Sequence, residues 1–207
     1  MPRRPSSAEE VGTRRRSLLD AAVAAFRERG VAGATVADIA DRAGMAKGSF
    51  YTYFSSKEHL IAALRERYVE GLLARADAIF GRVGQDDLVA LADELVATLV
   101  DFDLGEHEVV ELFYKQGMGG DATTEEFREA NRRLHEMIAV GIRVGVAAGV
   151  FDVPDPWLTA GLLNHAVHGF LEELVVHGDD VDRDAFVHAA TQLVRRALGA
   201  RPSVLSP

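Results

Sequence analysis

The chain has 207 residues, 27% of them charged, with no cysteine and a formal net charge of −9. The absence of cysteine excludes a disulfide framework, a thiolate zinc site and a cysteine nucleophile. The N-terminus lacks the apolar core of a secretory signal and no apolar run is long enough to span a bilayer, so we expect a soluble, cytoplasmic protein without membrane contact.

The charge is divided unevenly along the chain. Residues 1–57 hold ten Lys/Arg against six Asp/Glu, a net charge of +4, whereas residues 58–207 hold thirteen against twenty-six, a net charge of −13. A basic head on an acidic body suggests two functions, with any anionic polymer bound at the head. Chance clustering of surface charge is the alternative.

Helix signals begin at the N-terminus. Ser7 opens a Ser-x-x-Glu capping box, although Gly12 can delay the first helix to about Thr13, and Gly30 ends it. Thr35 caps a second, short helix that stops at Gly44. A third short helix is expected within "AKGSFYTYF".

The remaining chain continues with the same punctuation. Ser55 with Glu58 forms a capping box for a long helix to about Gly81 or Gly84. Further helices are expected at 86–103, 107–117, from the cap at Thr123 to about Gly149, from Asp155-Pro156 to about His177, and from Asp182 or Asp184 to near Gly199. No segment alternates with period two, so the fold class is all-α with about nine helices.

The stretch "GMAKGSFYTYFSSKEHL", residues 44–60, divides into two faces on a helix. Phe50 and Phe54 are four residues apart and therefore share a face, which we assign to the core. The other face carries donors suited to phosphate oxygens and base edges: Lys47, Ser49, Tyr51, Tyr53 and Lys57. For Lys57 alone, a solvated lysine is the alternative to a phosphate contact.

A helix, a tight glycine turn and a short helix form a helix-turn-helix. At residues 35–60 the sequence "TVADIADRAGMAKGSFYTYFSSKEHL" resembles the DNA-binding signature of the TetR/AcrR family of one-component transcriptional regulators. The resemblance implies a DNA-binding head at 1–57 and an effector-binding and dimerisation domain at 58–207. It places DNA contacts at Thr35, Lys47, Gly48, Ser49, Tyr51, Tyr53 and Lys57, to which Arg14 and Arg15 add basic groups.

The resemblance also implies a homodimer joined through the last two long helices. Both are largely apolar and rich in small residues, as a four-helix bundle across a two-fold axis requires. Packing inside one chain is the alternative. Interface candidates are Leu162, Val167, Leu174, Phe186, Ala190, Leu193 and Val194.

A central effector pocket is a third implication of the resemblance. Its candidates are apolar side chains of the middle helices and polar groups within apolar runs, and plain core packing is the alternative: Phe102, Phe113, Tyr114, Met118, Phe127, Asn131, Leu134, His135, Met137, His165, His168 and Phe170. His165, His168 and Glu172 have a spacing that metal ligands can adopt, but no further ligand cluster accompanies them. We therefore expect no metal and no cofactor.

An enzyme is the rival class. The sequence contains no glycine-rich phosphate loop, no Gly-x-Ser-x-Gly elbow and no His-Glu-x-x-His motif. A helical protein-interaction module is the third class, but it does not need an outward set of lysine and tyrosine. The expected function is a ligand-responsive repressor, a homodimer on palindromic double-stranded operator DNA that a small, largely apolar effector releases.

Overall fold

The computed structural model describes residues 8–115 and 125–200, without the side chains of residues 113–115, 125–128 and 130. Nine helices make up this part of the chain, which confirms the all-α fold class. Their bounds are α1 Ala8–Gly33, α2 Val36–Arg42, α3 Lys47–Phe50, α4 Lys57–Phe80, α5 Leu88–Gly105, α6 His107–Lys115, α7 Glu125–Ala147, the continuous helix α8 Pro156–Asn164, η1 His165–Gly169 and α9 Phe170–His177, and α10 Arg183–Ala197.

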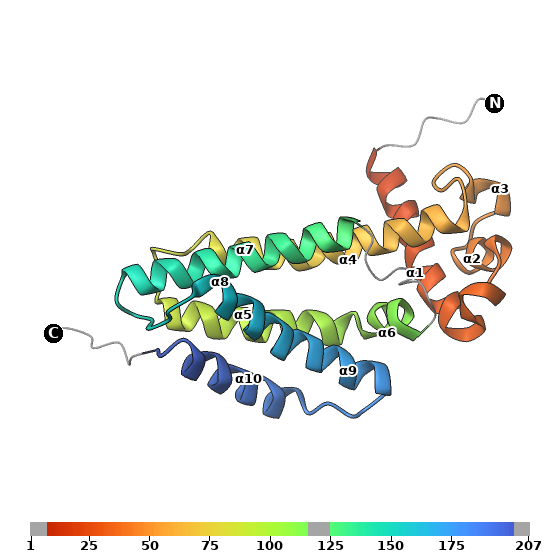
Figure 1. Cartoon of the computed structure of the whole chain (residues 1–207). Coiled ribbons are helices and arrows are strands. Elements are labelled where there is room, and N and C mark those ends of the chain that lie inside the picture. Colours follow the sequence, from red (N-terminus) through yellow and green to blue (C-terminus); the bar gives the residue numbers. More distant parts are fainter. Residues whose placement is uncertain (1–7, 116–124, 201–207) are drawn as a thin grey trace.

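The three N-terminal helices pack at one end of α4, which runs on into the rest of the molecule (Figure 1). Phe26 of α1, Ile39 of α2 and Phe50 of α3 are fully buried, and Phe54 joins them from the turn after α3. The rings of Phe50 and Phe54 lie 5.7 Å apart. This confirms the assignment of both phenylalanines to the core.

Two boundaries near the N-terminus differ from the sequence prediction. The N-cap of α4 is Ser56, whose hydroxyl accepts from the amide of His59, whereas the predicted cap Ser55 hydrogen-bonds the His59 ring. The helix therefore begins at Lys57. The third helix is also shorter than predicted, because after Phe50 the chain continues as turns.

The helices after α4 surround the long apolar α5. Helix α4 packs on α5 and α7, α10 packs on α5, and α8 packs on α7. Two glycines of α7, four residues apart, permit close contact with aromatic rings: a Cβ on Gly141 would lie 2.8 Å from Phe80, and one on Gly145 would overlap the ring of Phe151. No described helix is long and apolar enough to span a membrane.

The helix from Pro156 to His177 is interrupted by one π-helical segment, η1. Asp155 caps its start and Pro156 is its first residue, as predicted, but no sequence pattern indicated the wider turn at 165–169. A π segment bonds residue i to i+5 and thereby shifts the faces of the helix on either side of it. As a result His165 is exposed and bonds the carbonyl of Gly161, whereas His168 points into the molecule.

Candidate functional site

The exposed surface of α3 and the following turn is the first candidate site. Lys47 and Gly48 are exposed, and the side chain of Tyr51 is 52% exposed. Neither the Lys47 ammonium nor the Tyr51 hydroxyl has a hydrogen-bond partner within the described residues. A free cation and a free phenol on one short element are available to an external partner.

The other residues of this region that were expected to contact DNA are partly buried or already hydrogen-bonded. Ser49 and Tyr53 are half-buried, and Tyr53 packs against the core. Thr35 is exposed and caps α2 in a capping box with Asp38, as the sequence predicted. Hydrogen bonds from Thr35, followed by the charge of Arg29, lower the pKa of Asp38. These contacts fix the start of α2 relative to α1.

The two arginines of α1 that were expected to contact DNA, Arg14 and Arg15, bond to side chains of their own chain. Arg14 pairs with Glu10 one turn earlier. Arg15 lies 3.7 Å from the carboxylate of Glu66 and stacks over the ring of Phe54, 5.3 Å from its centroid. Both side chains remain partly exposed, so an additional phosphate contact is sterically open to them.

Lys57 has partners that the sequence did not indicate. Its ammonium donates to the carbonyl oxygens of Val31, at 2.7 Å, and Ala34, at 3.0 Å. Both carbonyls follow Gly30, whose non-helical backbone ends the regular part of α1 as the sequence predicted, so Lys57 ties the start of α4 to the segment that leads into α2. An internal role therefore explains a lysine that begins a helix, a position unfavourable for its charge.

We expect Lys57→Met to lower the free energy of unfolding by about 2 kcal/mol, because it removes two hydrogen bonds from a charged donor. Urea unfolding measures this change. If Lys57 acts only within the chain, the salt dependence of DNA binding stays unchanged in the variant. A variant of full stability whose salt slope falls by about one unit would instead identify a phosphate contact.

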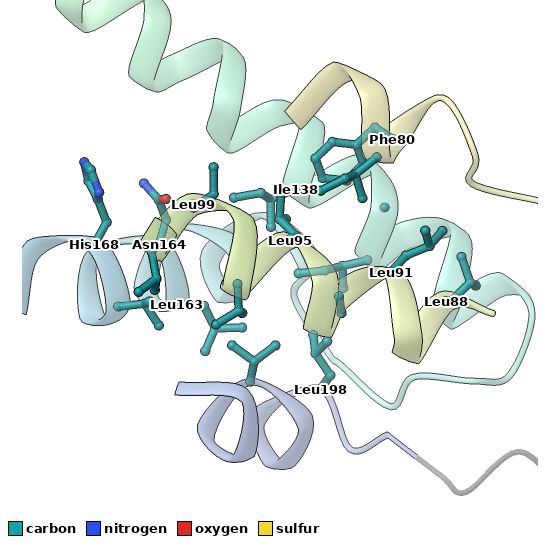
Figure 2. A pocket seen from close by; sticks show the side chains of 18 of the residues that line it. Phe80, Leu88, Leu91, Leu95, Leu99, Ile138, Leu163, Asn164, His168 and Leu198 are labelled. Atoms are coloured by element: carbon teal, nitrogen blue, oxygen red, sulfur yellow. The ribbon is translucent and has the colours of Figure 1, made fainter. Parts of the chain in front are cut away.

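The second candidate site is a cavity enclosed by the helices around α5. It contains about 880 Å³ of space, open solvent at its mouth included. Figure 2 shows apolar side chains along most of its length, with His168 and Asn164 at one end and Leu88 at the other. Its walls come from α4, α5, α7, the α8–α9 helix, α10 and adjoining residues, and include Phe80, Leu91, Leu95, Leu99, Ile138, Phe151, Leu163 and Leu198.

A hydrogen-bonded cluster forms the polar end of the cavity. Asp103 is only 2% exposed and accepts from the Tyr68 hydroxyl at 2.8 Å and from the His168 Nδ1 at 2.6 Å. The His168 Nε2 lies 3.1 Å from Glu172. Burial opposes the charge of His168, but hydrogen bonds and charges from these two carboxylates outweigh it and raise its pKa to about 10.

Of the residues that were expected to bind an effector and that the structure describes, only His168 lies in the cavity wall. Phe102, Leu134 and Met137 pack in the core next to α4. His135 stacks on Trp157, and Asn131, His165 and Phe170 are exposed. Met118 lies outside the described residues, as do the side chains of Phe113, Tyr114 and Phe127.

The sequence did contain a signal for the cavity. Helix α5 contributes lining residues at a spacing of three or four along its whole length: Leu88, Leu91, Ala92, Leu95, Val96, Leu99, Val100 and Asp103. An apolar stripe that ends in a carboxylate is unusual for a core helix, because buried charges need partners.

The expected interface residues separate into two groups. Leu162 and Leu193 are exposed, at 64% and 46%, and Val167, Leu174 and Phe186 are half-buried. Ala190 and Val194 are buried within the chain itself, where both belong to the core cluster around α5 and Val194 also lines the cavity. Ala190 and Val194 therefore pack inside one chain, which was the alternative to a dimer interface for these helices.

Among the described residues, no group of three or more His, Asp or Glu side chains is arranged to hold a metal ion. The π segment separates His165 from His168, and His168 is occupied by its two carboxylate partners.

Comparison with known proteins identifies relatives of the N-terminal part of the chain and one that extends over most of it. The family model for bacterial regulatory proteins of the tetR family matches residues 18–64. The chain is 46% identical over 68 residues to the transcriptional repressor KstR2 of Mycobacterium tuberculosis H37Rv, a match covering 33% of this chain and 34% of that protein. It is 30% identical over 190 residues to the repressor SCO4008 of Streptomyces coelicolor, covering 86% of this chain and 94% of that protein.

A solved structure shares the same fold. The structure of SmeT, the repressor of the multidrug efflux pump SmeDEF of Stenotrophomonas maltophilia, superposes with a TM-score of 0.69 at 25% identity. The superposition covers 93% of each chain.

Proposed function

Because the chain belongs to the tetR family of bacterial regulatory proteins, we propose that it is a cytoplasmic repressor that binds a palindromic operator as a homodimer. A small, largely apolar molecule in the cavity releases it from the DNA. The part of this function that follows from the family itself is regulation of transcription. The related members are DNA-binding transcriptional regulators and not enzymes. The domain division at about residue 57 is part of the proposal.

The exposed surface of α3 supports the proposed DNA contact. Lys47 has no partner in the described part of the chain and lies beside Gly48, where the backbone is unobstructed by a side chain. The Tyr51 hydroxyl provides a second free donor. Helix-turn-helix proteins place such donors in the major groove and against the flanking phosphates.

An exposed apolar face supports the proposed dimer. Most of the large apolar side chains exposed in the described structure lie in the last helices: Trp157, Leu158, Leu162, Phe170 and Leu193. The stacked rings of Phe170 and Phe186, 6.2 Å apart, connect the α9 and α10 portions of this face. An apolar patch of this kind on a monomer marks an interaction surface.

A continuous path from the cavity to the N-terminal helices supports the proposed release. Asp103 lies near the end of α5, directly before α6. Helix α6 packs on α1, with Val109 and Val110 in their shared core and Glu108 paired with Arg27. A ligand that displaces the end of α5 would therefore shift α6 against α1 and bias the separation of the two DNA-binding ends.

The observation that carries this proposal is the unpartnered Lys47 on α3 of a chain from this family. We expect Lys47→Gln to weaken binding to a duplex taken from the DNA flanking its own gene by about tenfold, the loss of roughly 1.4 kcal/mol. Fluorescence anisotropy at several salt concentrations measures the affinity and its salt slope.

Arg196→Gln provides the matched control. Arg196 is exposed near the end of α10 and has no partner in the described structure. Its replacement by Gln removes one positive charge, as Lys47→Gln does. Equal weakening by both substitutions would show a nonspecific charge effect and contradict a DNA contact at α3. Absence of salt-sensitive binding in the wild type would contradict the proposal itself.

A further inference from the structure

The chemistry of the cavity's polar end restricts what the cavity can bind. Three polar side chains line this end: Asp103, Asn164 and His168. The rest of the described lining is apolar. One end of a bound molecule must therefore satisfy these groups, and its remainder must be apolar.

Nearly every hydrogen-bond donor at this end is already used. Both ring nitrogens of His168 face carboxylates, Nδ1 facing Asp103 and Nε2 facing Glu172. Ionised carboxylates only accept, so both ring nitrogens carry protons and His168 is an imidazolium. The Tyr68 hydroxyl also donates to Asp103. His168 and Tyr68 thus have no donor left for a ligand.

Acceptors, in contrast, remain available. A carboxylate has about four lone-pair positions, and the described contacts of Asp103 use one on each oxygen. The Asn164 amide has no partner in the described structure and stands beside His168 at the cavity end (Figure 2). Asn164 directly precedes η1, so the wide turn determines where its side chain and that of His168 lie.

The position of the two carboxylates has the same consequence. Asp103 lines the cavity and presents its free lone pairs there, whereas Glu172 bonds His168 from outside the lining. A second carboxylate from a ligand would be repelled by Asp103 and would find only the Asn164 amide as a donor. A hydroxyl or an ammonium group would donate to Asp103.

The cavity is also elongated. Its lining residues on α5 run from Leu88 to Asp103, a distance of about 22 Å along a helix. Leu88 lies at the apolar end and the polar cluster lies at the other (Figure 2). A long apolar molecule with one polar terminus matches this distribution.

We propose that the cavity takes an elongated apolar molecule whose polar end donates a hydrogen bond, as a hydroxyl or an ammonium group does, and that it discriminates against a carboxylate on the same chain. This inference rests on the proposed role of the cavity as the effector site.

The test compares three probes that differ only at the terminus: 1-dodecanol, dodecylamine and dodecanoate. Each is titrated at pH 7, below its aggregation concentration, against the full-length protein carrying a neutral fluorescent dye in the cavity. We expect the alcohol and the amine to displace the dye at concentrations at least tenfold lower than the acid requires. Release of the flanking-DNA duplex by the same probes is measured in parallel.

Two variants locate the effect. Ala92→Phe places a ring into the apolar part of the lining and should abolish binding of all three probes. Asp103→Asn removes the negative charge at the polar end and should bring the affinity for dodecanoate close to that for the alcohol. Circular dichroism and thermal unfolding confirm that each variant is folded.

The outcomes separate the two proposals. Equal affinity for the three probes, or tighter binding of dodecanoate, overturns the inference about the polar end and leaves the effector role of the cavity standing. Binding that persists in folded Ala92→Phe places the probes elsewhere and overturns the inference. If no probe binds the protein and none releases it from DNA, both the inference about the polar end and the proposed effector role of the cavity are overturned.

Discussion

Replacing Leu162 by Arg is expected to convert the proposed dimer into a folded monomer and to reduce operator affinity about a hundredfold. Leu162 is 64% exposed, more than any other large apolar side chain in the described structure. In a two-fold interface the substitution enters twice, so two cations would be buried without partners. A loss of about 2.8 kcal/mol corresponds to the hundredfold change.

The measurement combines sedimentation velocity, for the mass in solution, with anisotropy of the labelled duplex. The matched control is Val140→Arg on α7, where another apolar side chain is 43% exposed. We expect this control to remain a dimer with wild-type affinity. A dimeric Leu162→Arg protein, or monomers from both substitutions, would contradict an interface formed by the last helices.

Leu193 allows the same surface to be tested from α10. Its side chain is 46% exposed. If both helices contribute to one interface, Leu193→Arg should also produce a monomer. Ala190 and Val194, which were expected beside it, are buried within the chain, so their substitution would destabilise the fold and report nothing about the dimer.

The helix-turn-helix was predictable because its signals are local. A capping box at Thr35, a glycine of positive φ at Gly44 and two phenylalanines four residues apart each determine the conformation of the nearest residues. These signals, taken together, also carried the resemblance to the family. Neighbouring residues specify this part almost completely.

Two features required contacts that sequence spacing does not contain. The carbonyls bonded by Lys57 lie more than twenty residues earlier in the chain, and Asp103 lies 65 residues before His168. Aromatic side chains were expected to line the effector pocket, but the described wall is mainly aliphatic, from residues distributed over α5 and its neighbours. The π segment at 165–169 altered the face assignments further, because an α-helical period was assumed there.

The second large effect concerns the charge of His168. Burial opposes that charge, but hydrogen bonds and charges from Asp103 and Glu172 raise the pKa from 6.5 to about 10. The stabilisation from this raised pKa is fully present below pH 6.5 and is lost as the pH rises through 10. We therefore expect His168→Gln to lower the free energy of unfolding by about 3 kcal/mol near pH 6.5, because it leaves Asp103 without its cation.

Urea unfolding of both proteins between pH 6.5 and 10.5 tests this expectation. The difference in stability should shrink steadily toward high pH, because the wild type then loses the charge that the variant lacks. Other groups that titrate above pH 9 affect both proteins and cancel in the difference. The control is His177→Gln, since His177 is exposed on α9 and bonds only the carbonyl of Glu173 in the described structure.

A pH-independent difference between wild type and His168→Gln would mean that His168 is neutral in the folded protein. One of its ring nitrogens would then lack a proton, and the contact with Asp103 or with Glu172 would place an unprotonated nitrogen against a carboxylate. Such a pair repels unless the carboxyl itself carries the proton, so this outcome would contradict the imidazolium assigned to His168 and the acceptor role assigned to the carboxylates. The pH profile thus tests the protonation of His168, on which the choice of ligand at the polar end depends.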